Sequence, residues 1–252
     1  MDKNKILNSI NNNYDKLVDV DRFAIDEERI IRCFDNIKTL LFPGYFDSKD
    51  NILDTIIEDL TSEIRKINVD YEKIVDDFIE RLPVIQEKVY KDVEAIYNGD
   101  PSAKTYSEII KSFPGFIAVL AYRIAHELYQ LNVPIIPRII AEYAHDKTGV
   151  DINPGARIGE YFCIDHGTGI VIGETTVIGD NVRLYHGVTL GVRSFTKDEM
   201  GNLMKGGKRH PNIGNNVIIY ANATILGGDT YIDDNSVIPT GSLILQTPEK
   251  FK

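Results

Sequence analysis

The stretch IVIGETTVIGDNVRLYHGVTLG, residues 170–191, repeats one kind of residue every six positions. Its aliphatic positions are Ile172, Ile178, Leu184 and Leu190. A period of six fits neither an α-helix nor an ordinary alternating strand. It is typical of a parallel β-helix, in which each repeat forms one short strand and one turn. We therefore predict triangular coils of three repeats, about 18 residues each.

The same period extends to both sides of this stretch. Small or branched residues stand two positions before several aliphatics, and glycine and asparagine occupy the turn positions, which need tight or left-handed backbone. We expect the inward-facing series to be Ile152, Ile158 and Ile164 before the stretch, and Ile213, Ile219, Ile225, Tyr231, Val237 and Leu243 after it.

Two irregularities interrupt the repeat. Eight positions separate Ile164 from Ile172, where the period requires six, so two residues are extra. We place them just after the stretch DHGTG, residues 165–169. Once they are subtracted, His186 follows His166 by one coil, so the two histidines should stack. The second irregularity is Gly191–Asn212, where the period stops and then resumes. A long loop on a regular scaffold is usually functional, so we expect an excursion loop at 191–212.

Residues 1–148 have a helical pattern instead. Apolar residues recur there at spacings of three and four with charges between them. Asn98-Gly99-Asp100-Pro101 is a break, and two further helices are predicted at roughly 115–131 and 135–147. The predicted fold class is therefore α+β with segregated halves: a helical domain at 1–148, then a left-handed parallel β-helix of hexapeptide repeats at 149–252, the catalytic domain.

Composition narrows the class of protein. The 252-residue chain has a formal net charge of −10, which does not suit nucleic acid or an anionic membrane as a partner. No apolar run approaches the roughly 18 residues that span a bilayer, and the polar N-terminus lacks a secretory pattern. Two cysteines, Cys33 and Cys163, cannot form a disulfide framework. We expect a cytoplasmic protein in which Cys163 is a small coil residue.

The polar residues of the repeat suggest acid–base chemistry. An imidazole such as His166 titrates near neutrality and can take a proton from a hydroxyl. Asp151 could hold the other ring nitrogen and stabilise the imidazolium. We expect Asp165 to point toward substrate and away from the ring. Arg209-His210, at the end of the excursion loop, could meet an anionic group such as a carboxylate.

Other functions are compatible with the same scaffold. His186 is more typical of a packing or interface residue than of a catalyst. A zinc-dependent hydro-lyase would need His166, His186 and His210 to converge on one ion, and the neighbouring aspartates do not fit the usual ligand spacing, so no metal is expected. A non-catalytic, partner-binding module remains a third interpretation.

The motifs together resemble the serine O-acetyltransferase family of hexapeptide-repeat acyltransferases. The resemblance covers about 100–245, and its motifs occur in the family's order. They are Asp100-Pro101 with Tyr106-Ser107, the segments AYRIAH at 121–126 and DINPGA at 151–156, the run 164–174, GVTLG at 187–191, and Arg209-His210-Pro211.

The resemblance implies an activity and a role for each matched residue. The expected reaction is acetyl transfer from acetyl-CoA to the hydroxyl of L-serine by direct attack, the first step of cysteine biosynthesis. Homoserine or a sugar would be alternative acceptors for the same scaffold. The implied roles are general base for His166, orienting carboxylate for Asp151, amine binding for Asp100 and Asp165, carboxylate binding for Arg209 and His210, and a place near the cofactor for Gly191 and Ala221.

The resemblance also implies an assembly. Family members are homotrimers with three shared sites, and the helical half often pairs two trimers. This sequence has Gly191-Val192 where a double glycine is usual. The family's long C-terminal tail, which docks onto cysteine synthase, has no counterpart after Leu245-Gln246, so we do not expect that docking.

Overall fold

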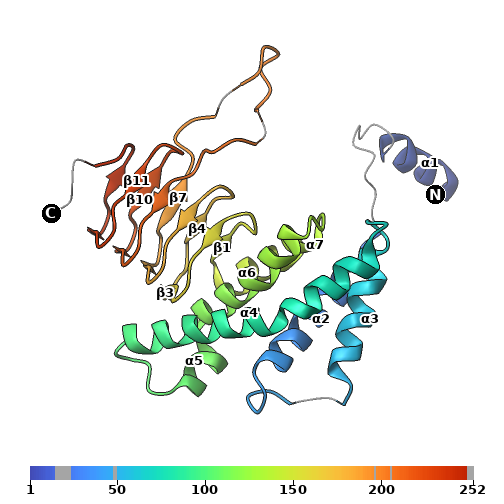
Figure 1. Ribbon diagram of the computed structural model, residues 1–252. Coiled ribbons are helices and arrows are strands. Elements are labelled where there is room, and N and C mark those ends of the chain that lie inside the picture. The colour runs from blue at the N-terminus through green and yellow to red at the C-terminus, as the bar shows by residue number, and fades with distance from the viewer. Residues whose placement is uncertain (15–23, 48–49, 196, 205, 249–252) are drawn as a thin grey trace.

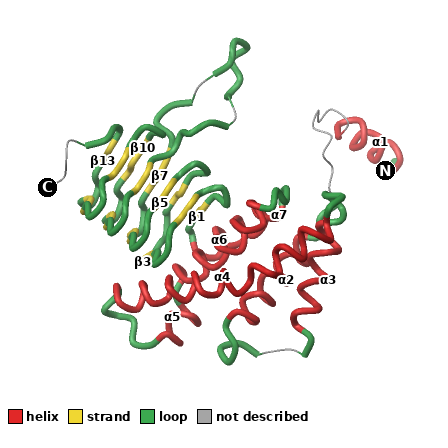
Figure 2. The backbone as a smooth tube through the Cα atoms, viewed as in Figure 1, coloured by secondary structure: helices red, strands yellow, loops and turns green. Residues whose placement is uncertain are grey.

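The computed structural model describes residues 1–14, 24–47, 50–195, 197–204 and 206–248. Helices occupy the first part of the chain, and all the strands follow them (Figures 1 and 2). The predicted helices near 115–131 and 135–147 are confirmed, and the expected break ends a long helix at Gly99. In order, the helices are α1 (Lys3–Tyr14), α2 (Glu27–Leu41), α3 (Ile52–Ile64), α4 (Tyr71–Gly99), α5 (Tyr106–Ser112), α6 (Pro114–Gln130) and α7 (Ile136–Thr148).

The strands are short and form three parallel sheets. The sheet orders are β1-β4-β7-β10-β13, β11-β8-β5-β2 and β12-β9-β6-β3, so the chain visits the three sheets in turn and winds a three-sided coil. The strands are β1 (Asp151–Ile152), β2 (Arg157–Ile158), β3 (Cys163–Asp165), β4 (Val171–Ile172), β5 (Val177–Ile178), β6 (Arg183–Tyr185), β7 (Thr189–Gly191), β8 (Asn212–Ile213), β9 (Ile218–Ile219), β10 (Thr224–Leu226), β11 (Tyr231–Ile232), β12 (Val237–Ile238) and β13 (Leu243–Ile244).

The inside of the coil is a column of stacked aliphatic residues. Ile152, Ile172, Leu190 and Ile225 align in register on one side, and all four are buried. Parallel sheets pair one strand with the next coil, so each inward residue packs on its equivalent above and below. The period of six in the sequence reflects the spacing of these inward-facing residues. The loop between β7 and β8 projects from the coil at the place expected for the excursion (Figure 1).

The predicted inward series is wrong after Ile225. Tyr231, Val237 and Leu243 are 44%, 49% and 66% exposed, whereas the residues that follow them, Ile232, Ile238 and Ile244, are buried. Seven positions separate Ile225 from Ile232, whereas six separate Ile172 from Ile178, so the segment from β10 to β11 holds one residue more than the pattern allows. Gly227 in that segment adopts φ +104°. This single extra residue shifts the phase of the last three repeats by one position.

The position predicted for the two extra residues near the DHGTG stretch is also wrong. Asp165 pairs with Tyr185 on one side of the corner, and Gly187 N–H donates to the carbonyl of Thr168 on the other. That hydrogen bond aligns Gly187 with Gly169. Three residues, 166–168, lie between the two aligned pairs in the first coil, and one, His186, lies between them in the next. The insertion is therefore His166-Gly167, inside the stretch, and both residues have positive φ.

Helix α6 closes the first coil. Its Val119 and Tyr122 belong to the hydrophobic core of the coil, while its opposite face packs in the helical core. The Tyr122 hydroxyl donates to the carbonyl of Ala156 at 2.7 Å and accepts from Ile158 N–H at 3.1 Å. An aliphatic end of the coil left in contact with water would be unfavourable, and α6 covers one of the two ends.

A buried ion pair fastens α4 and α6 to the coil. Arg123 on α6 donates from Nε and Nη2 to the two carboxylate oxygens of Asp92 on α4, at 2.9 and 3.0 Å. The same guanidinium donates to the carbonyls of Ile158 and Gly159, and Asp92 accepts from Phe162 N–H at 2.8 Å. Arg123 and Asp92 are 4% and 1% exposed. Every polar group of the pair is thereby satisfied.

No helix among the described residues is long and apolar enough to cross a membrane.

We expect Arg123→Met to lower the free energy of unfolding by about 3–5 kcal/mol, because it leaves the Asp92 carboxylate buried without its partner. Urea unfolding at fixed protein concentration measures this. Arg65→Met, at an exposed arginine beyond α3, is the matched control and should change stability by no more than about 0.5 kcal/mol. An R123M chain as stable as the control would contradict the importance of the pair.

Candidate active site

The turns of the coil fall on corners, and two corners carry the site residues. The histidine corner comprises the turns 166–170, 186–188, 220–223 and 239–242, which lead into the five-stranded sheet. The arginine corner comprises the turns 153–156, 173–176, 192–211 and 227–230, which leave that sheet. The strands of the five-stranded sheet therefore separate the two corners.

His166 projects from the histidine corner. Its side chain is 77% exposed, and its backbone has φ +58°, a conformation that few non-glycine residues adopt. The regular ladder is restored directly after it, where Gly169 N–H donates to the carbonyl of Gly149. The two-residue insertion thus lifts one imidazole out of an otherwise uniform surface. Backbone strain of this kind is concentrated at functional sites.

Two side chains approach the His166 ring. The ring of His186 lies 5.9 Å away, centroid to centroid, in an edge-on arrangement, which confirms the predicted stacking. The Asp165 Oδ1 atom lies 3.7 Å from His166 Nε2. The structure differs here from the expectation that Asp165 turns away from the ring. Asp165 is the last residue of β3 and directly precedes His166, so the two side chains are neighbours at the start of the turn.

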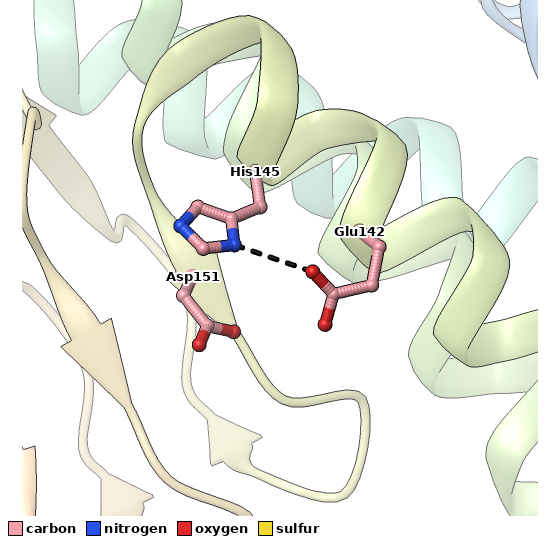
Figure 3. A group of neighbouring side chains, drawn as sticks. All are labelled: Glu142, His145 and Asp151. Atoms are coloured by element: carbon pink, nitrogen blue, oxygen red, sulfur yellow. Dashed lines mark hydrogen bonds and ion pairs between the residues drawn. The ribbon is translucent and has the colours of Figure 1, made fainter.

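Asp151 lies beside a different imidazole. One carboxylate oxygen of Asp151, one of Glu142 and a ring nitrogen of His145 lie within 4.8 Å of one another (Figure 3). His145 Nδ1 is 3.3 Å from Glu142 Oε2, and Glu142 also pairs with Arg138. Among the residues that the structure describes, no hydrogen bond or ion pair joins Asp151 to His166. His145 precedes Asp151 by only six positions, but the change from helix to strand between them means that a repeat spacing does not reveal their contact.

Asp165 is the last residue of β3, and Asp100 follows the end of α4, a helix that packs against β3. Asp100 caps α4, and its Oδ1 atom accepts from Ser102 N–H at 2.8 Å. Burial raises the pKa of the Cys163 thiol on β3 to about 12; the charges of Asp165 and Asp100 act in the same direction, and Arg183 opposes them. Asp165 lies on the same strand as Cys163, and the charge of Asp100 also acts on the thiol. The thiol itself is buried and held protonated, as expected for a small coil residue.

The arginine corner holds Arg209 and His210. Arg209 Nη2 pairs with the Glu174 carboxylate, whose other oxygen accepts from the Tyr129 hydroxyl at 3.2 Å. His210 is 6% exposed, and its ring covers Gly173, where a Cβ atom would lie 2.0 Å from His210 Nε2. Glu174 was not predicted as a partner, although its charge next to a glycine turn was a usable signal.

His210 is held as a neutral imidazole. Its Nδ1 atom accepts from Thr175 N–H at 3.1 Å, so the ring proton of the neutral form is on Nε2. The pKa of His210 is lowered to about 4, mainly by burial and also by the charges of Arg209 and Lys208, while the charge of Glu174 opposes this shift. His210 can therefore donate a hydrogen bond from Nε2, whereas the positive charge of this corner comes from Arg209.

One protomer does not bring all the predicted residues together. His166, Asp165 and Ala221 belong to the histidine corner or its edge, and Arg209 and His210 belong to the arginine corner. Gly191 ends β7 on the arginine side, where a Cβ atom would lie 2.9 Å from Leu226 Cδ2, so this glycine also serves packing. For the same reason the three imidazoles of a zinc site do not converge within one chain, because His210 is separated from the other two by the sheet.

Comparison with known proteins gives consistent matches. Residues 47–121 match the family model described as "Serine acetyltransferase, N-terminal". The chain is 50% identical over 178 residues to a plasmid-encoded serine acetyltransferase of Synechococcus elongatus, covering 67% of this chain and 56% of that relative. It is 44% identical over 161 residues to the serine acetyltransferase of Staphylococcus xylosus, covering 64% and 70%. The chain thus spans little more than half of the first relative's length.

Solved structures show the same fold. Serine acetyltransferase 1 of Entamoeba histolytica, in complex with L-cysteine, matches with a TM-score of 0.73 and 34% identity over 90% of this chain and 87% of that one. The serine acetyltransferase of Brucella abortus, in complex with coenzyme A, matches with a TM-score of 0.63 and 27% identity over 86% and 75%.

The lowered pKa of His210 predicts a loss of stability in acid. Between its ordinary value of 6.5 and about 4, the unfolded chain binds a proton at this ring and the folded chain does not. The contribution is thus fully present above pH 6.5 and is lost as the pH falls toward 4, with a slope of up to about 1.4 kcal/mol per pH unit. His210→Asn removes the titrating ring. Urea unfolding from pH 7.5 to 4.5 should show the stability difference between the two proteins narrowing, whereas a constant difference would contradict the neutral, buried imidazole.

Proposed function

The chain belongs to the serine acetyltransferase family, and on that premise we propose that it transfers the acetyl group of acetyl-CoA to the hydroxyl of L-serine. The observation that carries the proposal is His166, an exposed imidazole lifted out of the coil by a two-residue insertion and flanked by a carboxylate. The Brucella relative was solved with coenzyme A, which supports acetyl-CoA as the co-substrate. The product, O-acetylserine, is a precursor for cysteine.

The proposed chemistry needs one base and one anion site. His166 takes the proton of the serine hydroxyl as the oxygen attacks the thioester carbonyl. The tetrahedral intermediate then collapses, the carbon–sulfur bond breaks, and the imidazolium returns the proton to the departing thiolate. Backbone N–H groups near Gly191 would face the oxyanion. Asp151, which begins the strand beneath the histidine corner, would hold the other ring nitrogen and fix its tautomer.

The remaining residues would bind the two charged ends of serine. Asp100 and Asp165, whose charges both act on the Cys163 thiol, would take the ammonium group. Arg209 would take the carboxylate with help from the Nε2–H group of His210. Because Arg209 already pairs with Glu174 in the free chain, the substrate carboxylate would share or displace that partner.

We further propose a division into a helical domain at 1–148 and a left-handed parallel β-helix at 149–252 that assembles as a trimer, alone or paired into a dimer of trimers. Three parallel β-helices, one from each subunit, would place the histidine corner of one subunit against the arginine corner of the next. This arrangement unites the groups that the sheet separates within one chain, and it makes three equivalent sites. CoA would lie in the groove between subunits, along Gly191 of one coil and Ala221 of the other.

We expect His166→Ala to reduce the release of CoA thiol from acetyl-CoA and L-serine by about 10²–10⁴-fold, the usual contribution of a general base. A thiol-reactive dye measures the initial rate. Because the His166 side chain is exposed, the melting temperature should not change. A comparison of L-serine, homoserine and a sugar as acetyl acceptors at equal concentration tests which hydroxyl the enzyme acetylates. An H166A enzyme with full activity would contradict the proposal.

Subunit mixing tests the shared site. H166A and Arg209→Ala homotrimers should each be nearly inactive. When the two are unfolded together and refolded at equal ratio, about a quarter of the subunit junctions unite an intact His166 with an intact Arg209, and activity should recover to about that fraction. Recovery to no more than the average of the two single variants would show that both residues act within one chain.

A further inference from the structure

The C-terminal end of α4 rests on an arginine of the coil. Arg183 on β6 donates from Nη1 to the carbonyl of Gly99 at 2.7 Å. Gly99 is the last residue of α4, and Asp100 follows it as the cap. A cation at a helix C-terminus also interacts favourably with the helix dipole. One side chain therefore fixes the backbone immediately before Asp100.

The close approach explains why residue 99 is a glycine. A Cβ atom at Gly99 would lie 1.8 Å from Arg183 Nη2 and 2.4 Å from Cζ. Gly99 is not among the glycines with positive φ, so left-handed backbone is not the reason for it. Glycine in a helix is less favourable than alanine by about 1 kcal/mol. Glycine is nevertheless required at position 99, because the Arg183 guanidinium occupies the space that a Cβ atom would need.

The same arginine adjoins the strand that carries Asp165. Arg183 aligns with Cys163 across the β3–β6 pair, and Tyr185, two residues on, aligns with Asp165. The charge of Asp165 acts on Arg183 directly. Arg183 therefore contacts the end of α4, which Asp100 follows, from the strand that pairs with β3, which ends in Asp165.

This contact is separate from the buried ion pair. Asp92 lies seven residues before Gly99, or about 10 Å along the helix axis at 1.5 Å per residue. The pair of Asp92 and Arg123 would still hold α4 on the coil without Arg183. Loss of Arg183 would free the last turn of α4, and with it Asp100.

We propose that Arg183 is a positioning residue that acts through Gly99 to set the separation of Asp100 and Asp165, and so determines how selectively the site takes the ammonium group of an α-amino acid. The inference rests on the proposed function, which assigns the two carboxylates to the substrate amine. An ammonium group gains from two carboxylates only when both are within contact distance. A displacement of about 1 Å at a substrate-positioning group can cost a hundredfold.

Arg183→Gln, Arg183→Lys and the control Arg65→Gln test the proposal, with wild-type protein assayed alongside. The acceptors are L-serine and 3-hydroxypropanoate, which is serine without its amino group. We expect R183Q to raise KM for L-serine about tenfold or more, with little change in KM for acetyl-CoA or in melting temperature. The preference for L-serine over 3-hydroxypropanoate, as a ratio of kcat/KM, should fall by a similar factor. R183K should show a serine KM and an amine preference between those of wild type and R183Q, because lysine keeps the charge but lacks the planar guanidinium.

The outcomes separate this inference from the proposed function. A wild-type enzyme that acetylates no L-serine overturns both. An active wild type whose R183Q and R183K variants keep the serine KM and the amine preference overturns the role of Arg183 and leaves the function standing. An R183Q chain that loses cooperative unfolding, or that loses kcat for both acceptors equally with unchanged preference, would assign Arg183 to the fold and would also overturn the proposal.

Discussion

The guanidinium of Arg123 is the constraint on which the arrangement depends. It joins α4, α6 and the backbone of the first coil through directed hydrogen bonds that are buried, or partly buried in the case of the Gly159 carbonyl. Burying two charges is costly, and an apolar contact of similar volume often gives equal stability. An apolar contact would not fix an angle, however, whereas the planar guanidinium of an arginine donates to its partners in a fixed geometry. The pair therefore determines how the long helix α4 crosses the coil.

That crossing places the functional groups. Because α4 is fixed at Asp92, it packs against β3, the strand that ends in Asp165, while Arg183 holds the last turn of α4 before Asp100. The repeating coil supplies the other half of the geometry. Its ladders fix the backbone on both sides of the His166-Gly167 insertion, so two extra residues can leave the surface without disturbing the strands. The coil thereby presents the exposed imidazole of His166, with the exposed ring of His186 beside it on the next coil.

The sequence predicted the parts of the structure that repeat. Each coil contributes inward aliphatics at a fixed spacing, so the coil, the helical first part and the stacking of His186 on His166 followed from counting. Counting failed where two phases were equally apolar: Tyr231-Ile232 and Val237-Ile238 offer an inward candidate in either frame, and only the turn at Gly227 decides between them. The partners of the site residues could not be counted at all. Glu174 meets Arg209 across 35 residues, and His145 meets Asp151 across the boundary between α7 and β1.

The central claim is that serine binds between the histidine corner of one subunit and the arginine corner of another. A crystal structure of the assembled protein with L-serine tests it most directly. The account predicts the ammonium group between Asp100 and Asp165, the hydroxyl within hydrogen-bond distance of His166, and the carboxylate on Arg209 and His210 of the neighbouring subunit. Serine bound by the residues of one subunit only, or away from the His166 imidazole, would contradict it.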